Sequence, residues 1–95
     1  MTIRWAKDAA RQLAAAHEYV AIDSPKAAGR LLIRIVNAVN SLGSYPHAGR
    51  EGRVSNTREL VIVGTPYVVA YRIKSKNVIQ ILAILHGKRK WPKRF

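Results

Sequence analysis

The apolar residues of this chain change their spacing near the middle of the sequence. Up to Gly43 they recur every three or four residues, which is the spacing of one face of an α-helix. After Asn56 they gather in three short runs rich in Val, Ile and Tyr, a composition typical of β-strands. Helices followed by strands predict an α+β fold with a helical layer packed on a sheet. Ninety-five residues can enclose one modest core, so we expect a single domain over residues 1–95.

Two amphipathic helices are expected in the first half. The apolar stripe of the first helix consists of Trp5, Ala9, Leu13, Ala16 and Val20. Ser24 can cap the second helix, Pro25 suits its first position, and Gly43 can end it. The apolar face of the second helix consists of Ala28, Leu31, Leu32, Ile35, Val39 and Leu42. The short connection around residues 21–25 predicts that the two helices form a hairpin.

Three strands are expected in the second half, over residues 57–63, 67–73 and 78–85. The connections between them are only three and four residues long, so an antiparallel meander is the simplest topology. A further short strand is expected at 2–5, and residues 44–56 are expected to form a loop. The predicted order is β-α-α-β-β-β.

The last predicted strand is apolar on both of its faces. With strict alternation, Val78, Leu82 and Ile84 share one face. The other face carries Ile79, Ile81 and Leu85. Two helices can cover only one of these faces. Three explanations remain open: a central strand buried on both sides, a first strand and a C-terminal tail that fold over the second face, or a partner chain that covers it.

The positive charge of the chain is concentrated in its second half. The net charge is +12, and residues 44–95 contribute eleven Lys and Arg against two acids, whereas residues 1–43 contribute six against three. Five of the eight residues in the tail 88–95 are cations. Such a field favours a polyanion, such as nucleic acid or the ribosome, or an acidic protein partner. A basic protein without such a partner is the alternative.

Several chemistries lack the residues they need. The chain has no cysteine, and no two of His17, His47 and His86 have the helical spacing of a zinc site, so no metal is predicted. The five acids are dispersed, and no Gly-rich phosphate loop is present, so no cofactor is predicted. No segment has the length of a membrane span or a signal peptide, so we expect a cytoplasmic protein.

Four stretches together resemble the RelE/ParE superfamily of bacterial type II toxin-antitoxin toxins. They are AARQLAAAHEYV, SPKAAGRLLIRIVNAVNSLGSYPHAGR, TRELVIVGTPYVVAYRI and ILAILHGKRKWP, and they span nearly the whole chain. The resemblance implies two N-terminal helices on a curved antiparallel sheet, which agrees with the order derived above. It also implies a cognate antitoxin with an acidic or amphipathic segment that binds and neutralises the toxin in a hetero-oligomer.

The superfamily contains two kinds of toxin. RelE-like members cleave mRNA on the ribosome without a metal, whereas ParE-like members poison DNA gyrase. By resemblance, Arg89 occupies the position of a nuclease arginine, but Val68 replaces a second arginine and Phe95 stands near a required tyrosine. A nuclease would therefore have to use Arg72, His86 and Arg89 as its catalytic candidates. The resemblance favours the gyrase-directed branch, with the nuclease and a nontoxic basic binding module as alternatives.

Seven residues are predicted to contact the target: Arg58, Arg72, His86, Lys88, Arg89, Lys90 and Trp91. Several of these residues can instead have a structural role. His86 can be a packed histidine with one hydrogen bond, and Trp91 can anchor the tail on the sheet instead of stacking on a base. Arg72 interrupts an apolar face, so it should border a polar cleft or find a carboxylate.

Overall fold

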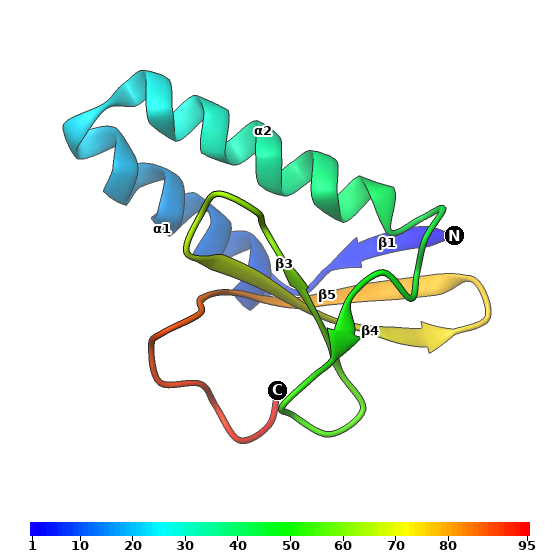
Figure 1. Cartoon of the computed structure of the whole chain (residues 1–95). Coiled ribbons are helices and arrows are strands. Elements are labelled where there is room, and N and C mark those ends of the chain that lie inside the picture. The colour runs from blue at the N-terminus through cyan, green and yellow to red at the C-terminus, as the bar shows by residue number, and fades with distance from the viewer.

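The computed structural model describes residues 1–95 and contains two helices and five strands. In chain order the elements are β1 (Thr2–Trp5), α1 (Lys7–Asp23), α2 (Pro25–Ser41), β2 (Arg50–Glu51), β3 (Arg58–Val61), β4 (Tyr67–Ser75) and β5 (Val78–His86). The helices lie together on one side of the sheet (Figure 1). The α+β architecture and the helical hairpin predicted from the sequence are confirmed. Neither helix is long and apolar enough to cross a membrane.

A single residue, Ser24, separates the two helices. Its hydroxyl oxygen accepts a hydrogen bond of 3.1 Å from the backbone N–H of Ala27, which satisfies one of the free donors of the first turn of α2. Pro25 fills the first position of that helix, where it removes no hydrogen bond. The capping prediction is therefore confirmed, and the sharp hairpin follows from these two residues.

The five strands form one sheet in the order β1-β5-β4-β3-β2. The pairs β3–β4 and β4–β5 are antiparallel, which confirms the predicted meander. The sheet is nevertheless mixed, because β1 pairs with β5 in parallel, with Thr2 opposite Val78 and Trp5 opposite Ile81. A parallel pair needs a long connection, and the helices and other strands lie between β1 and β5 in the chain. The two-residue strand β2 lies inside the predicted loop 44–56 and was not predicted.

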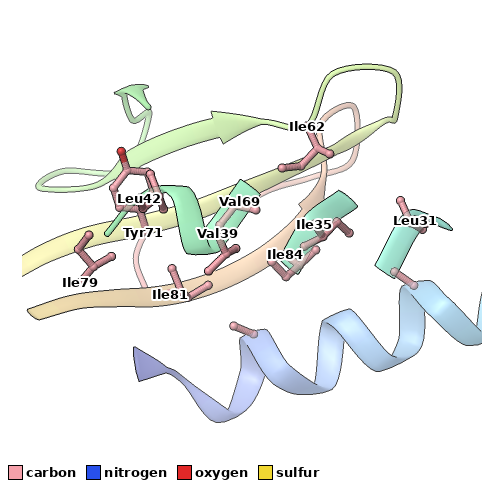
Figure 2. Close-up of a cluster of buried hydrophobic side chains, with 12 residues drawn as sticks. Leu31, Ile35, Val39, Leu42, Ile62, Val69, Tyr71, Ile79, Ile81 and Ile84 are labelled. Atoms are coloured by element: carbon pink, nitrogen blue, oxygen red, sulfur yellow. The ribbon is translucent and has the colours of Figure 1, made fainter. Parts of the chain in front are cut away.

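The main core lies between the helices and the sheet (Figure 2). Helix α2 contributes Leu31, Ile35, Val39 and Leu42, while the sheet contributes Val69, Tyr71, Ile79, Ile81 and Ile84. The residues of α2 are those that the helical period predicted, except that Leu32 of the predicted face is only half-buried. Helix α1 buries mainly Ala9 and Ala16, so its small side chains allow it to pack closely.

A β-bulge in β5 changes which of its residues face the helices. Tyr71 pairs with Ile81 while Ala70 pairs with Ala83, so Leu82 is the extra residue on β5. The alternation is shifted by one residue after this point. Ile84 therefore joins Ile81 in the core under the helices, and the prediction that placed Ile84 on the opposite face is wrong.

Candidate functional site

The face of the sheet that points away from the helices is here called the second face. Three cross-strand pairs of β4 and β5 lie on it: Val68 with Leu85, Ala70 with Ala83, and Arg72 with Gln80. Val68, Ala70 and Ala83 are at most 5% exposed, although no helix covers them. Because β5 lies between β1 and β4, it is a central strand, and other parts of the chain cover its second face.

The basic tail, residues 88–95, leaves β5 and curves on the side of the sheet opposite the helices (Figure 1). With the loop 54–57 and the start of α1 it encloses a cleft of about 640 Å³, here called the tail cleft. Leu82, Ala83 and Leu85 supply apolar lining from β5. Of the explanations left open by the sequence, a central strand and a folded tail both hold, whereas β1 extends the sheet instead of covering it.

Arg72 borders the tail cleft, as the sequence predicted. Its side chain is exposed, and its Nε donates a hydrogen bond of 2.8 Å to Oε1 of Gln80 on the neighbouring strand. This contact gives the guanidinium a polar partner without neutralising its charge. A cation is therefore present at the edge of the cleft.

Glu59 is a buried carboxylate next to the second face, opposite Ala70 of β4. Its side chain is 2% exposed and accepts hydrogen bonds from Arg50 (2.9 and 3.3 Å) and from the backbone N–H (2.8 Å) and guanidinium (3.1 and 3.2 Å) of Arg53. Burial alone would raise the pKa of Glu59, but the hydrogen bonds from Arg53 and Arg50 and the positive charge of Arg53 hold it below its ordinary value. We name these three residues the Glu59 cluster.

Trp91 attaches the tail to this cluster. The guanidinium carbon of Arg53 lies 3.6 Å from the centre of the Trp91 ring, and the indole Nε1 donates a hydrogen bond of 3.2 Å to the carbonyl oxygen of His86. The indole is thus fixed at two points within the chain. This geometry corresponds to the anchoring role of Trp91, one of the two roles considered from the sequence.

The cations of the tail have no acidic partner in the chain. Lys88, Arg89 and Lys90 are exposed at the end of β5, and the ion pairs of the molecule involve only other arginines. His86 precedes them, with its ring edge-on to Tyr67 at 6.0 Å. Its Nδ1 accepts a hydrogen bond of 3.3 Å from the backbone N–H of Lys88. His86 therefore has the packing and the single hydrogen bond of a structural histidine.

Arg58 contacts the loop before β2 rather than the tail cleft. Its Nε donates to the carbonyl oxygen of Gly49 at 2.9 Å and its Nη2 to that of His47 at 3.2 Å. The same loop is held by the hydroxyl of buried Tyr71, which donates to the carbonyl of Pro46 at 2.8 Å and accepts from the Gly49 N–H at 2.9 Å. Arg58 thus has a structural role that the sequence did not indicate.

The three nuclease candidates are not brought together. Arg72 lies opposite Gln80 and lines the tail cleft, whereas His86 and Arg89 line a separate cavity of about 400 Å³ beside α1. Gln80 and His86 are six positions apart on strand β5, which corresponds to roughly 15–20 Å. A general base and a cation for one phosphate must lie within a few ångströms of the reacting atoms, so these residues do not form one catalytic group as they stand. No three His, Asp or Glu side chains lie together as metal ligands.

Comparison with known proteins gives a consistent result. The family described as "ParE toxin of type II toxin-antitoxin system, parDE" matches residues 3–91. The chain belongs to this family. It is a ParE-like type II toxin of the RelE/ParE superfamily, so the resemblance identified in the sequence is confirmed.

Individual relatives of this ParE-family toxin agree in length and fold. "Putative toxin Y4kP" of Sinorhizobium fredii is 44% identical, and the match covers 95% of this chain and 92% of that protein. "Toxin RelE2" of Caulobacter vibrioides is 36% identical, with 90% and 93% covered. A solved structure described as "Chromosomal ParDE TA system from P. aeruginosa" has a TM-score of 0.81 and 31% identity, with 93% and 97% covered.

Two positions distinguish this ParE-family chain from the nuclease pattern. Val68 is 5% exposed on the second face, where it pairs with Leu85. Phe95 is 46% exposed and lines the tail cleft. Neither side chain can supply a positive charge or a proton. By the resemblance, a nuclease of the superfamily would carry an arginine in place of Val68 and a tyrosine near Phe95, and this comparison stays a prediction.

Proposed function

We propose that this toxin inhibits growth by poisoning DNA gyrase or its complex with DNA, and that it does so by binding rather than by cleaving a bond. The observation that carries the proposal is the state of the tail: Lys88, Arg89 and Lys90 are exposed and unpaired next to a histidine that is already packed and hydrogen-bonded. Free cations of this kind suit electrostatic contact with a polyanionic complex.

The alternative, an mRNA endonuclease acting on the ribosome, has less support. It would need Arg72, His86 and Arg89 to act together, and they line two different cavities. It would also need replacements for the charge missing at Val68 and the hydroxyl missing at Phe95. A nontoxic basic binding module would use the same exposed cations, and only an activity measurement separates it from a toxin.

The partner that neutralises this chain is proposed to be a cognate antitoxin with an acidic or amphipathic segment. The solved relative is described as part of a ParDE system, and the net charge of +12 favours a negatively charged partner. The two proteins would then form a hetero-oligomer. Binding should weaken as salt rises, since salt screens exposed charges. An affinity that is equal at low and high salt would contradict the electrostatic part of this proposal.

A gyrase supercoiling assay with the full chain tests the main proposal. We expect inhibition by the wild type and a clear loss of inhibition in Lys88→Ala/Lys90→Ala. The matched control is Lys74→Ala/Lys76→Ala, which removes two exposed lysines near the other end of the β4–β5 hairpin. That variant should inhibit like the wild type. Equal losses in both variants would point to net charge rather than to the tail.

A ribosome assay tests the alternative with the same proteins. Translating ribosomes incubated with the toxin should leave their mRNA intact. Cleavage in the ribosomal A site that is lost in Arg89→Ala would overturn the gyrase proposal and assign the chain to the nuclease branch. Absence of any inhibition of gyrase at saturating toxin would also overturn it, and harmless expression without antitoxin would support the nontoxic module.

A further inference from the structure

One side chain, that of Trp91, makes the polar contacts that fix the far part of the basic tail to the rest of the molecule. Near β5 the backbone N–H of Gly87 donates to the carbonyl of Pro66 at 2.8 Å, and that of Arg89 to the carbonyl of His86 at 3.1 Å. Beyond Arg89 the backbone makes no hydrogen bond to another part of the chain. The contacts of the Trp91 indole with Arg53 and with the His86 carbonyl are what hold this segment.

The carboxylate of Glu59 holds Arg53 in one orientation. Its backbone N–H, its Nε and its Nη2 all donate to the buried carboxylate of Glu59. The donors along the edge of the guanidinium are thereby directed at the carboxylate, which leaves the flat face of the group available for the indole. A lysine cannot reproduce this arrangement, because its ammonium is a point charge without a planar face.

We infer that Arg53, oriented by Glu59, is a positioning residue that holds the basic tail on the second face and fixes where its cations are presented. Glu59 thus acts through Arg53, and Trp91 is the contact between the cluster and the tail. The attachment follows from these contacts alone. Its importance for growth inhibition rests on the function proposed above.

The loop 54–57 and the tail both line the tail cleft. Val54 and Thr57 are buried parts of the loop, while Pro92, Arg94 and Phe95 are the lining residues of the tail. When Arg53 releases Trp91, the segment beyond Arg89 keeps only the hydrogen bond from the indole to the His86 carbonyl, so the tail detaches more often and the cleft opens from that side. The cations beyond Arg89, namely Lys90, Lys93 and Arg94, then belong to a mobile segment rather than to a fixed surface.

Arg50 provides a matched control, because it also donates two hydrogen bonds to Glu59, whereas the guanidinium over the Trp91 ring is that of Arg53. The chain has two tryptophans, so a Trp5→Phe background leaves Trp91 as the single tryptophan probe. Acrylamide quenching of Trp91 fluorescence is then compared in the full chain, in Arg53→Ala, in Arg53→Lys and in Arg50→Ala. Denaturant unfolding of each variant checks that it is folded.

We expect Arg53→Ala to raise the open population of the tail about two- to fivefold, the factor that corresponds to one arginine over a tryptophan face. Quenching of Trp91 should rise accordingly, Arg53→Lys should lie between the wild type and Arg53→Ala, and Arg50→Ala should match the wild type. Quenching that is unchanged in both Arg53 variants, or that rises equally in Arg50→Ala, would overturn the inference. If Arg53→Ala does not fold, the comparison of Arg53→Lys with Arg50→Ala decides it.

Growth inhibition by the same variants separates this inference from the proposed function. Greater quenching in Arg53→Ala together with weaker growth inhibition supports both the attachment and its role. Greater quenching with full growth inhibition overturns the positioning role while the toxin assignment stands. A wild type that fails to inhibit gyrase refutes the proposed target, and the quenching result still decides whether Arg53 holds the tail.

Discussion

The two faces of the sheet are closed by different physical means. Towards the helices, Ile35, Val39 and Leu42 pack on Tyr71 and Ile81, and the contact is almost wholly apolar (Figure 2). On the second face, small apolar residues lie beneath a charged cluster and a tail that is attached through one tryptophan. The first face should therefore determine global stability, whereas the second can open without unfolding the protein.

Removing apolar volume from the helix side should have the largest effect. Ile35 is fully buried in the centre of α2, so Ile35→Ala should lower the free energy of unfolding by about 2–5 kcal/mol, through lost burial and a cavity. Denaturant unfolding followed by circular dichroism measures this change. The control Ile35→Val should lose only about 0.5–1.5 kcal/mol. A loss below that range in the alanine variant would mean that this face does not dominate stability.

Removing the charge at the centre of the second face should have an intermediate effect. Glu59→Gln should lower the free energy of unfolding by about 1–3 kcal/mol, because hydrogen bonds to a buried charged group are lost. The loss stays limited because the arginine side chains are 58% and 44% exposed and can return to water. The control Glu51→Gln changes an exposed carboxylate without an ion pair and should shift stability by less than about 0.5 kcal/mol.

Lowering the pH should remove the contribution of Glu59 without any mutation. The pKa of Glu59 is lower in the folded chain than its ordinary value of 4.5, so its contribution is complete above about that pH. It is lost as the pH falls through the lower folded pKa, because the protonated carboxyl no longer attracts the two arginines. The unfolding free energies of the wild type and Glu59→Gln, measured from pH 7 downwards, should converge in this range. A constant difference would contradict this role of the carboxylate.

The smallest effect is expected for an ion pair on the helical surface. Arg11 and Asp8 pair one turn apart on α1, and their side chains are 74% and 68% exposed. Arg11→Ala should lower the free energy of unfolding by no more than about 0.5 kcal/mol, and high salt should abolish even that difference. A loss as large as that of Glu59→Gln would show that burial is not what strengthens the Glu59 cluster.

Local patterns were sufficient for most of the fold. The stripe of apolar residues in each helix, the cap at Ser24 and the short connections between strands all depend on neighbours in the sequence, and they were confirmed, except that Trp5 of the first stripe belongs to β1. The parallel pairing of β1 and the bulge at Leu82 were not predicted, because both depend on how distant strands align. The bulge moves the side chain of Ile84 to the helix side of the sheet. The alternation of residues in the sequence does not show where such a bulge occurs.

The candidate site was predicted only in its composition. The cations from Lys88 to Lys90 and the missing groups at Val68 and Phe95 could be identified from the residues and from the family resemblance. The Glu59 cluster was not identified, since in the sequence Glu59 is one of five dispersed acids. The available signal was a carboxylate on a strand with two arginines in the preceding loop. The sequence does not show which residues of such a loop lie next to which residues of the strand.

The sequence alone determined that helices pack on a sheet and that the second half of the chain is basic. These properties follow from residue type and spacing, which do not change on folding. The resemblance to the superfamily added that Val68 and Phe95 stand where a nuclease would carry an arginine and a tyrosine. Only the tertiary structure decided that Glu59 is buried, that Arg53 lies over Trp91, and that the tail and the second face line one cleft. Each of these depends on contacts between residues far apart in the chain, and the contacts exist only once the sheet and the loop are in place.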